Sequence, residues 1–233
     1  MNKYRVRRLI SAILSIIFLL GAIILNTPAP NADPVVSKAL IQNNKNSTLA
    51  LDALKQLSIK GRAPKTGYER SLFGDSWQEK DGCDMRNIIL NRDFKNVTTN
   101  DKCQVTSGVL NDPYTGKAVT FIRSNSSNDT IQIDHVVALS DAWQKGAQLL
   151  THEQRIQFAN DPLELLAVDG KANQQKGDGD AATWLPSNKS FRCQYIARQI
   201  AVKHKYNLWI TQAEYDAMVT ILDKCDNQLL PIE

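Results

Sequence analysis

The stretch IQIDHVVALSDAW (Ile131 to Trp143) places an aspartate and one of the chain's three histidines side by side between apolar residues. Ile131 and Ile133 alternate with polar residues, which predicts a strand that ends at Asp134 and His135. The residues after the pair are predicted to form a helix. An imidazole can act as a general base near neutral pH, and a carboxylate can hold a hard cation. For this dipeptide alone, the simpler interpretation is a hydrogen-bonded core histidine beside a helix-capping aspartate.

A second segment, PLELLAVDGKANQQKGDGD (Pro162 to Asp180), extends the pattern. Its apolar run predicts a buried strand, and the Asp-Gly pair after that run predicts a turn into a helix. Asn173 and Lys176 lie three positions apart and therefore share one face of this helix. An isolated asparagine is typical of a solvated helix. The chain also keeps a fixed order: a strand, the Asp-His pair, helices, a second strand, a turn, and a helix with Asn and Lys. This ordered series is much more specific than any one of its members.

The rest of the sequence predicts an α+β fold that is mainly helical, with few strands. Two further strands are predicted on either side of the turn-forming sequence NDPYTG, and further helices are predicted from apolar spacing and end signals. The strands are expected at 104–110 and 118–123, and the helices at 48–59, 84–94, twice within 136–159, and at 187–206 and 211–225.

The formal net charge of +4 comes from the N-terminus. Residues 1–32 contain Lys3, Arg5, Arg7 and Arg8 and no acidic residue. Removing these four from the 28 basic residues leaves 24, which equals the number of acidic residues. Nucleic-acid binding does not follow from composition here, because the chain lacks a global basic footprint. Any phosphate-binding site must be local.

An uncharged apolar run, residues 9–25, follows the basic N-terminus. This arrangement is typical of a signal peptide or of a retained membrane anchor, within residues 1–32. Contact with a membrane is expected only through residues 9–25 of an uncleaved segment. In both cases the rest of the chain is expected to be secreted or anchored on the extracytoplasmic side. Residues 33–61 are predicted to be a linker with a first helix, and residues 62–233 the main domain.

The four cysteines are Cys83, Cys103, Cys193 and Cys225, and none forms a CxxC pair. An even number of cysteines in an exported chain favours two disulfides. Three pairings are open. We favour Cys83–Cys103 with Cys193–Cys225, because each bond then closes a local loop. The alternative is four free buried thiols.

Several separate blocks, from about Tyr68 to Cys225, resemble the HNH nuclease superfamily. The resemblance is closest to exported proteins related to the C-terminal domain of GmrSD-type restriction enzymes. It implies a small ββα-metal (His-Me finger) core. The blocks are GYERSLFGDSW, DGCDMRN, DPYTG, IDHVVALSDAWQKGA, FANDPLELLAVDGKANQQKGDGDAATWLP and FRCQYIARQIAVKHKY.

The resemblance implies a role for each matched residue. His135 is expected to be the general base, and Asp134 and Asn173 the ligands of a divalent metal. Mg²⁺ is the expected ion; Mn²⁺ can replace it, and Zn²⁺ suits the site less without a second histidine. The middle residue of the motif, usually Asn, is Glu164, which accepts hydrogen bonds but lacks the amide donor. Asp178, in the turn-like sequence GDGD, is a weaker candidate for the metal site, as is the aspartate two positions later.

Three basic residues are candidates to bind substrate phosphates: Lys176, Arg70 and Arg86. A solvated helix lysine is an equal alternative for Lys176. For Arg86, a structural ion pair with Asp84 is the favoured alternative.

These expectations define an exported metal-dependent endonuclease that hydrolyses DNA, with RNA as a second candidate substrate and no small-molecule cofactor. The alternative is a non-catalytic extracellular module of the same fold that binds nucleic acid or a protein partner. Glu164 and the neutral charge after residue 32 motivate this alternative.

Overall fold

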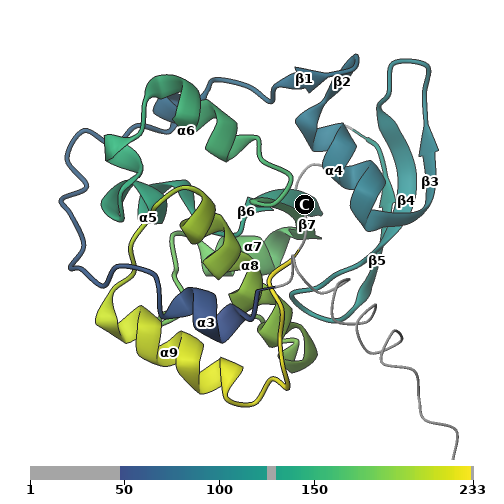
Figure 1. The fold of residues 1–233 in the computed structure, drawn as a ribbon. Coiled ribbons are helices and arrows are strands. Elements are labelled where there is room, and N and C mark those ends of the chain that lie inside the picture. Colours follow the sequence, from purple (N-terminus) through teal and green to yellow (C-terminus); the bar gives the residue numbers. More distant parts are fainter. Residues whose placement is uncertain (1–47, 125–129, 232–233) are drawn as a thin grey trace, which may run out of the picture. The chain divides into compact units, whose positions relative to one another are not determined.

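A computed structural model of the chain describes residues 48–124 and 130–231 (Figure 1). The expected signal peptide or anchor at 1–32 and the linker residues 33–47 lie outside these ranges. Within them, no helix combines the length and hydropathy needed to cross a membrane.

The centre of the fold is an antiparallel pair of strands, β6 (Ile131–His135) and β7 (Leu165–Asp169), followed directly by helix α7 (Gly170–Lys176). Ile131 pairs with Asp169 and His135 with Leu165. The Asp169 carboxylate caps α7 by accepting from the Ala172 backbone N–H at 2.9 Å. The two strands and the helix predicted from the opening stretches are therefore present and adjacent.

The continuous apolar run of β7 follows from its position between two cores. Successive side chains of a strand point to opposite faces. Leu166 and Val168 accordingly belong to one hydrophobic cluster, whereas Leu165 and Ala167 belong to another. A strand that is buried on both faces needs apolar residues at every position.

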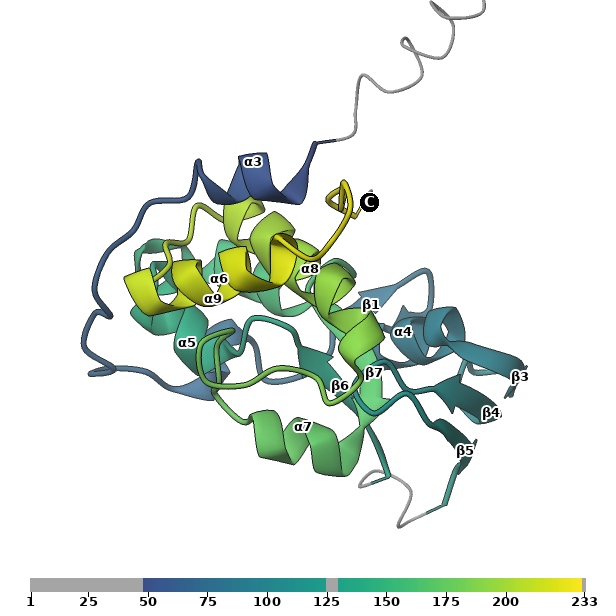
Figure 2. The ribbon, with the colours of Figure 1, turned by 90° about the horizontal axis from the view of Figure 1, so that it is seen from below.

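The first cluster is enclosed by helices, with the β6–β7 pair between them and the three-stranded sheet (Figures 1 and 2). A disulfide between Cys193 and Cys225 ties the last two helices together. The helices that enclose the first cluster are α3 (Ala50–Leu54), α5 (Leu139–Gln144), α6 (His152–Ala159), α8 (Arg192–Lys205) and α9 (Gln212–Leu222).

The second cluster lies between the β6–β7 pair, helix α4 (Met85–Asp93) and an antiparallel sheet of order β3-β4-β5. Gly108 on β4 allows close packing, because an added Cβ would lie 2.5 Å from the Phe94 ring. The Cys83–Cys103 disulfide ties this layer to the start of α4. The strands are β1 (Glu79–Lys80), β2 (Cys83–Asp84), β3 (Phe94–Thr99), β4 (Val105–Asn111) and β5 (Ala118–Ile122).

The expected mixture of helices and small sheets is confirmed, and so are both disulfides in the favoured pairing. The first and penultimate helices are shorter than predicted. Strand β3 was not predicted.

Candidate active site

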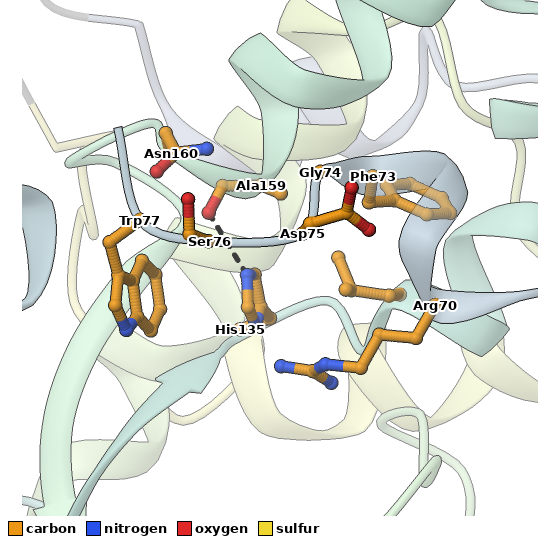
Figure 3. A pocket seen from close by; sticks show the side chains of 10 residues that line it. Arg70, Phe73, Gly74, Asp75, Ser76, Trp77, His135, Ala159 and Asn160 are labelled. Atoms are coloured by element: carbon orange, nitrogen blue, oxygen red, sulfur yellow. Dashed lines mark hydrogen bonds between the residues drawn. The ribbon is translucent and has the colours of Figure 1, made fainter. Parts of the chain in front are cut away.

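His135 lies at the end of β6 and is buried, with 7% of its surface exposed. Its Nε2 is 3.0 Å from the backbone carbonyl oxygen of Ala159, at the end of α6. Because a carbonyl oxygen only accepts hydrogen bonds, Nε2 carries the proton and Nδ1 has the free lone pair. Figure 3 shows this bond and the Arg70 side chain extending toward the opposite part of the ring.

The surroundings of His135 hold its imidazole neutral. Burial lowers the pKa of His135 from 6.5 to about 3, with a further contribution from the positive charge of Arg70. The hydrogen bond with Ala159 opposes this shift only in part. Near neutral pH the ring is therefore uncharged and has an open Nδ1, which is the protonation state that a general base requires.

Trp77 stacks beside the imidazole and was not identified from the sequence. The two ring centroids are 5.8 Å apart, and the ring planes differ by 10°. The next residue anchors this segment, because the backbone N–H of Gln78 donates to Asn160 Oδ1 at 2.8 Å. The matched block GYERSLFGDSW ends at Trp77, and this was the only sequence signal that pointed to it.

Glu164 holds the turn that follows His135. Both of its carboxylate oxygens lie 3.2 Å from the backbone nitrogen of Val137, which donates to them. The carbonyl of Glu164 accepts from the backbone N–H of Val136 at 2.9 Å. Burial raises the pKa of Glu164 well above its usual value. Among the described residues the Glu164 side chain makes hydrogen bonds only as an acceptor, and a carboxyl group can provide these without the amide donor of an asparagine.

Asp134 is buried and accepts two hydrogen bonds. The hydroxyl of Tyr114 donates to Oδ2, and Lys176 Nζ donates to Oδ1 at 2.9 Å. Burial raises the pKa of Asp134, against the opposing effects of Lys176 and Tyr114. Tyr114 was not identified as a site residue from the sequence.

Lys176 is placed differently from both interpretations of the sequence. Its side chain is fully buried, and its ammonium group also donates to the carbonyl of His135 at 2.8 Å. It is therefore neither a solvated lysine nor one that faces a substrate phosphate. Instead its ammonium group holds the carboxylate of Asp134 and the backbone carbonyl of His135 in place.

Asn173 is oriented by its neighbour on β6. Its Nδ2 donates to Gln132 Oε1 at 2.9 Å, and no partner of its Oδ1 lies among the described residues. Asn173 lines a pocket of about 230 Å³ together with Asp134, His135 and Arg70. The structure thus brings four of the predicted site residues around one pocket.

Asp178 also lines this pocket, but its side chain is mostly exposed and pairs with Lys65 at 3.0 Å. Burial raises its pKa, but the hydrogen bond from Lys65 and the positive charges of Lys65 and Lys176 act in the opposite direction, and the net shift is downward. Asp178 is therefore an anionic group at the edge of the pocket.

A second pocket of about 370 Å³ adjoins the first and shares Arg70, His135 and Leu139 with it. Figure 3 shows this pocket, with Trp77 and Arg70 on different sides of the imidazole. Arg70 begins a short 3₁₀ helix (Arg70–Phe73) and is exposed, so its guanidinium is accessible from both pockets.

Arg86 lines neither pocket. It is half-buried and donates to the carbonyl of Ile131 at 3.2 Å. The Asp84 carboxylate instead caps α4 by accepting from the Asn87 backbone N–H at 2.8 Å. Within the described residues the expected Asp84–Arg86 ion pair is absent, and Arg86 serves to join α4 to β6.

Three further buried carboxylates, Asp141, Asp180 and Glu214, lie close enough together to suggest a metal site. Lys145 Nζ already occupies their centre, at 2.7 Å from Asp141, 2.8 Å from Asp180 and 2.7 Å from Glu214. Lys203 and Arg62 add two more cations to this charge cluster. Three cations balance three anions, so the cluster has no need of a metal. Asp180 therefore belongs to this cluster and not to the pocket beside His135.

The pocket lined by Asp134, His135 and Asn173 contains oxygen atoms that suit a hard divalent cation as ligands. Carboxylate and amide oxygens are the ligands that Mg²⁺ prefers. The open Oδ1 of Asn173 provides one such oxygen. A carboxylate has about four lone-pair sites, so the two hydrogen bonds to Asp134 leave it able to bind an ion.

A family model and a known protein both match this chain. A family model described as GmrSD restriction endonucleases, C-terminal domain, matches residues 81–221. A protein of Arthroderma benhamiae, described as an uncharacterized secreted protein, is 37% identical over 205 residues. The match covers 87% of this chain and 94% of that protein.

Proposed function

Because the chain belongs to the family of GmrSD restriction endonuclease C-terminal domains, we propose that it is an exported, metal-dependent endonuclease. It hydrolyses phosphodiester bonds of DNA, with RNA as a second candidate substrate. In this proposal β6, β7 and α7 form the ββα-metal (His-Me finger) core of the HNH superfamily.

One observation carries the proposal: the orientation of His135. Its Nε2 proton is committed to the Ala159 carbonyl, and the ring also lines the pocket formed with Asp134 and Asn173. A histidine that served only the core would gain from having partners at both nitrogens. Here Nδ1 has no hydrogen-bond partner among the described residues, and the low pKa keeps it unprotonated.

The proposed chemistry assigns a task to each group around the pocket. Nδ1 of His135 accepts a proton from the water that attacks phosphorus, while the Ala159 carbonyl stabilises the imidazolium that results. The exposed guanidinium of Arg70 binds oxygens of the scissile phosphate. Asp134 and Asn173 would hold Mg²⁺, which, when bound, stabilises charge on the phosphate and on the departing oxygen. Lys176 and Glu164 are positioning residues, because they hold the backbone on either side of His135.

Export is supported by the basic and apolar N-terminal sequence and by both disulfides, which persist in oxidising compartments. The related protein of Arthroderma benhamiae is described as secreted. A secreted protein, with residues 1–32 removed, is the form that we propose to be active.

Plasmid cleavage tests the metal-dependent activity. We expect residues 33–233, purified under oxidising conditions, to nick or degrade supercoiled DNA with Mg²⁺ or Mn²⁺ and to stop when EDTA is added. Asn173→Ala should raise the Mg²⁺ concentration needed for half-maximal rate by about tenfold or more, as loss of a ligand-shell contact does. Gln175→Ala, an exposed amide on the same helix, is the matched control. Full activity in EDTA would exclude the proposal.

A non-catalytic nucleic-acid-binding module remains the second candidate. The observation that favours it is that both oxygens of Asp134 already accept hydrogen bonds, from Lys176 and Tyr114. DNA retention that resists EDTA, with no turnover in any divalent metal, would select this function over the first.

A further inference from the structure

We propose that the pocket between Trp77 and Arg70 binds one unpaired nucleobase of the substrate, next to the phosphate that is cleaved. The inference rests on the proposed function and deepens it, because it makes single-stranded or locally unpaired nucleic acid the preferred substrate class. It concerns the larger, 370 Å³ pocket, which the cleavage chemistry itself does not use.

The position of the pocket links it to the reacting phosphate. Arg70 and His135 line both this pocket and the neighbouring one that contains Asp134 and Asn173. A nucleotide whose phosphate contacts Arg70 can therefore direct its base to the Trp77 side of the imidazole. Figure 3 shows Trp77 and Arg70 flanking His135 from different directions.

The lining of the pocket suits a flat heteroaromatic ring. Trp77 is half-buried and lines the pocket, and its ring plane lies within 10° of the imidazole plane. The pocket volume falls in the range of small-ligand sites. Aromatic side chains are the usual platforms for unstacked bases, because every base offers a π-face. Trp77 is also held in place, since the Gln78 backbone is bonded to Asn160.

The polar groups of the pocket favour a base over a second phosphate. Asp75 and Ser76 line it, both are exposed, and the described residues provide no partner for either side chain. A carboxylate repels phosphate, but it accepts hydrogen bonds from the N–H groups on a base edge. Arg70 is the cation in the lining, and it is shared with the phosphate side.

A base in a duplex is stacked and paired, and it reaches such a pocket only by leaving the helix, at a cost that single strands do not incur. The pocket therefore favours binding of single-stranded over double-stranded nucleic acid. Stacking of one base on an aromatic side chain changes affinity by about 10- to 100-fold. That range sets the size of the expected preference.

The test compares oligonucleotide binding in EDTA, where cleavage is absent. Residues 33–233 are titrated, by fluorescence anisotropy, into a labelled single-stranded DNA, its RNA equivalent, its duplex, and the same strand with abasic sites. We expect the intact single strands to bind about tenfold or more tightly than the abasic strand and the duplex. Trp77→Ala should remove this difference, whereas Trp77→Phe should retain most of it. Trp209→Phe is the matched control, because Trp209 lines neither pocket.

Equal binding of intact and abasic strands by the wild-type protein would overturn the inference. So would a folded Trp77→Ala protein that still discriminates between them. Cleavage rates with Mg²⁺ separate this failure from failure of the proposed function. Base-dependent binding without cleavage in any metal would leave the pocket assignment standing and reject the nuclease. If the protein cleaves single-stranded and double-stranded DNA at equal rates, and Trp77→Ala lowers both rates equally, only the assignment of the pocket to a base is rejected and the nuclease activity stands.

Discussion

The orientation of His135 depends on residues that do not touch its imidazole. Glu164 holds the Val137 amide on one side, and Lys176 holds the carbonyl of His135 itself. Asp134 accepts from Lys176 and from Tyr114, so the strand end is fixed through both its backbone and its side chains. The general base that we propose His135 to be must be held in one orientation to be effective, and these buried contacts provide that constraint.

Substitution of Glu164 separates hydrogen bonding from charge. Glu164→Gln keeps an acceptor for the Val137 amide and removes a carboxyl group that burial already disfavours as an anion. We expect its free energy of unfolding to stay within about 1 kcal/mol of wild type. Glu164→Ala leaves a buried N–H without a partner and should cost about 2–4 kcal/mol. Urea denaturation measures both changes, and equal destabilisation by the two variants would contradict this role.

At the scale of elements, the sequence predicted those with regular apolar periodicity. Strand β6, strand β7 and helix α7 were predicted in the right order because their patterns are local. Two helices were predicted within 136–159, and the second of them, α6, begins with a capping box between Thr151 and Gln154. Strand β3, with the polar sequence FKNVTT, was missed because only its pairing with β4 makes it a strand.

The end of the chain shows how tertiary contacts override a local signal. Thr211 followed by Glu214 three positions later is the sequence signature of a capping box at the start of α9. Thr211 does cap the helix, accepting from the Glu214 backbone at 3.2 Å. The Glu214 carboxylate instead lies fully buried, with Lys145 and Lys203 as partners. Nothing in the sequence near Glu214 indicates these distant lysines.

The pairing of helices α8 and α9 should depend strongly on their disulfide. Cys193 and Cys225 are 32 residues apart in the sequence. Closing a loop of that size is worth about 3–4 kcal/mol in the chain-entropy model. We expect the Cys193→Ser/Cys225→Ser protein to lose about this much stability in urea denaturation. A double variant as stable as wild type would show that the packing of α8 against α9 is sufficient without the bond.

At the scale of the whole molecule, the candidate site combines segments that are far apart in the sequence. Arg70 and Trp77 come from the region before α4, Tyr114 from the β4–β5 connection, and Asn173 from α7. The resemblance identified the motif residues Asp134, His135 and Asn173, and the structure brings these three around one pocket. Trp77, Tyr114 and the burial of Lys176 were not predictable, since only the folded chain brings these groups to the Asp-His pair.

The charge cluster around Lys145 should make acid stability depend on Asp180. Burial raises the pKa of Asp180, but Lys145 and Arg62 outweigh burial and lower it from 3.8 to about 2. The unfolded chain therefore binds more protons than the folded one between these pH values. The stabilisation is complete above pH 3.8 and is lost as the pH falls toward 2, by at most about 1.4 kcal/mol per pH unit.

Asp180→Asn removes this titration. We expect a lower free energy of unfolding at pH 7 and a flatter pH dependence between pH 4 and 2 than in the wild-type protein. Asp216→Asn, an exposed carboxylate on α9, should behave like wild type. Urea denaturation across the pH range measures the slopes. An unchanged slope in Asp180→Asn would show that Asp180 is not the titrating group.

The central claim is that His135 acts as the general base of a nuclease. The most direct test is the rate of Mg²⁺-dependent plasmid cleavage by His135→Ala, with and without added imidazole, in a protein whose thermal unfolding shows that it is folded. General-base catalysis contributes about 10²- to 10⁴-fold, so we expect a loss of that size, partial recovery with imidazole, and no loss in His152→Ala, which removes an exposed histidine. Undiminished cleavage by folded His135→Ala would contradict the account.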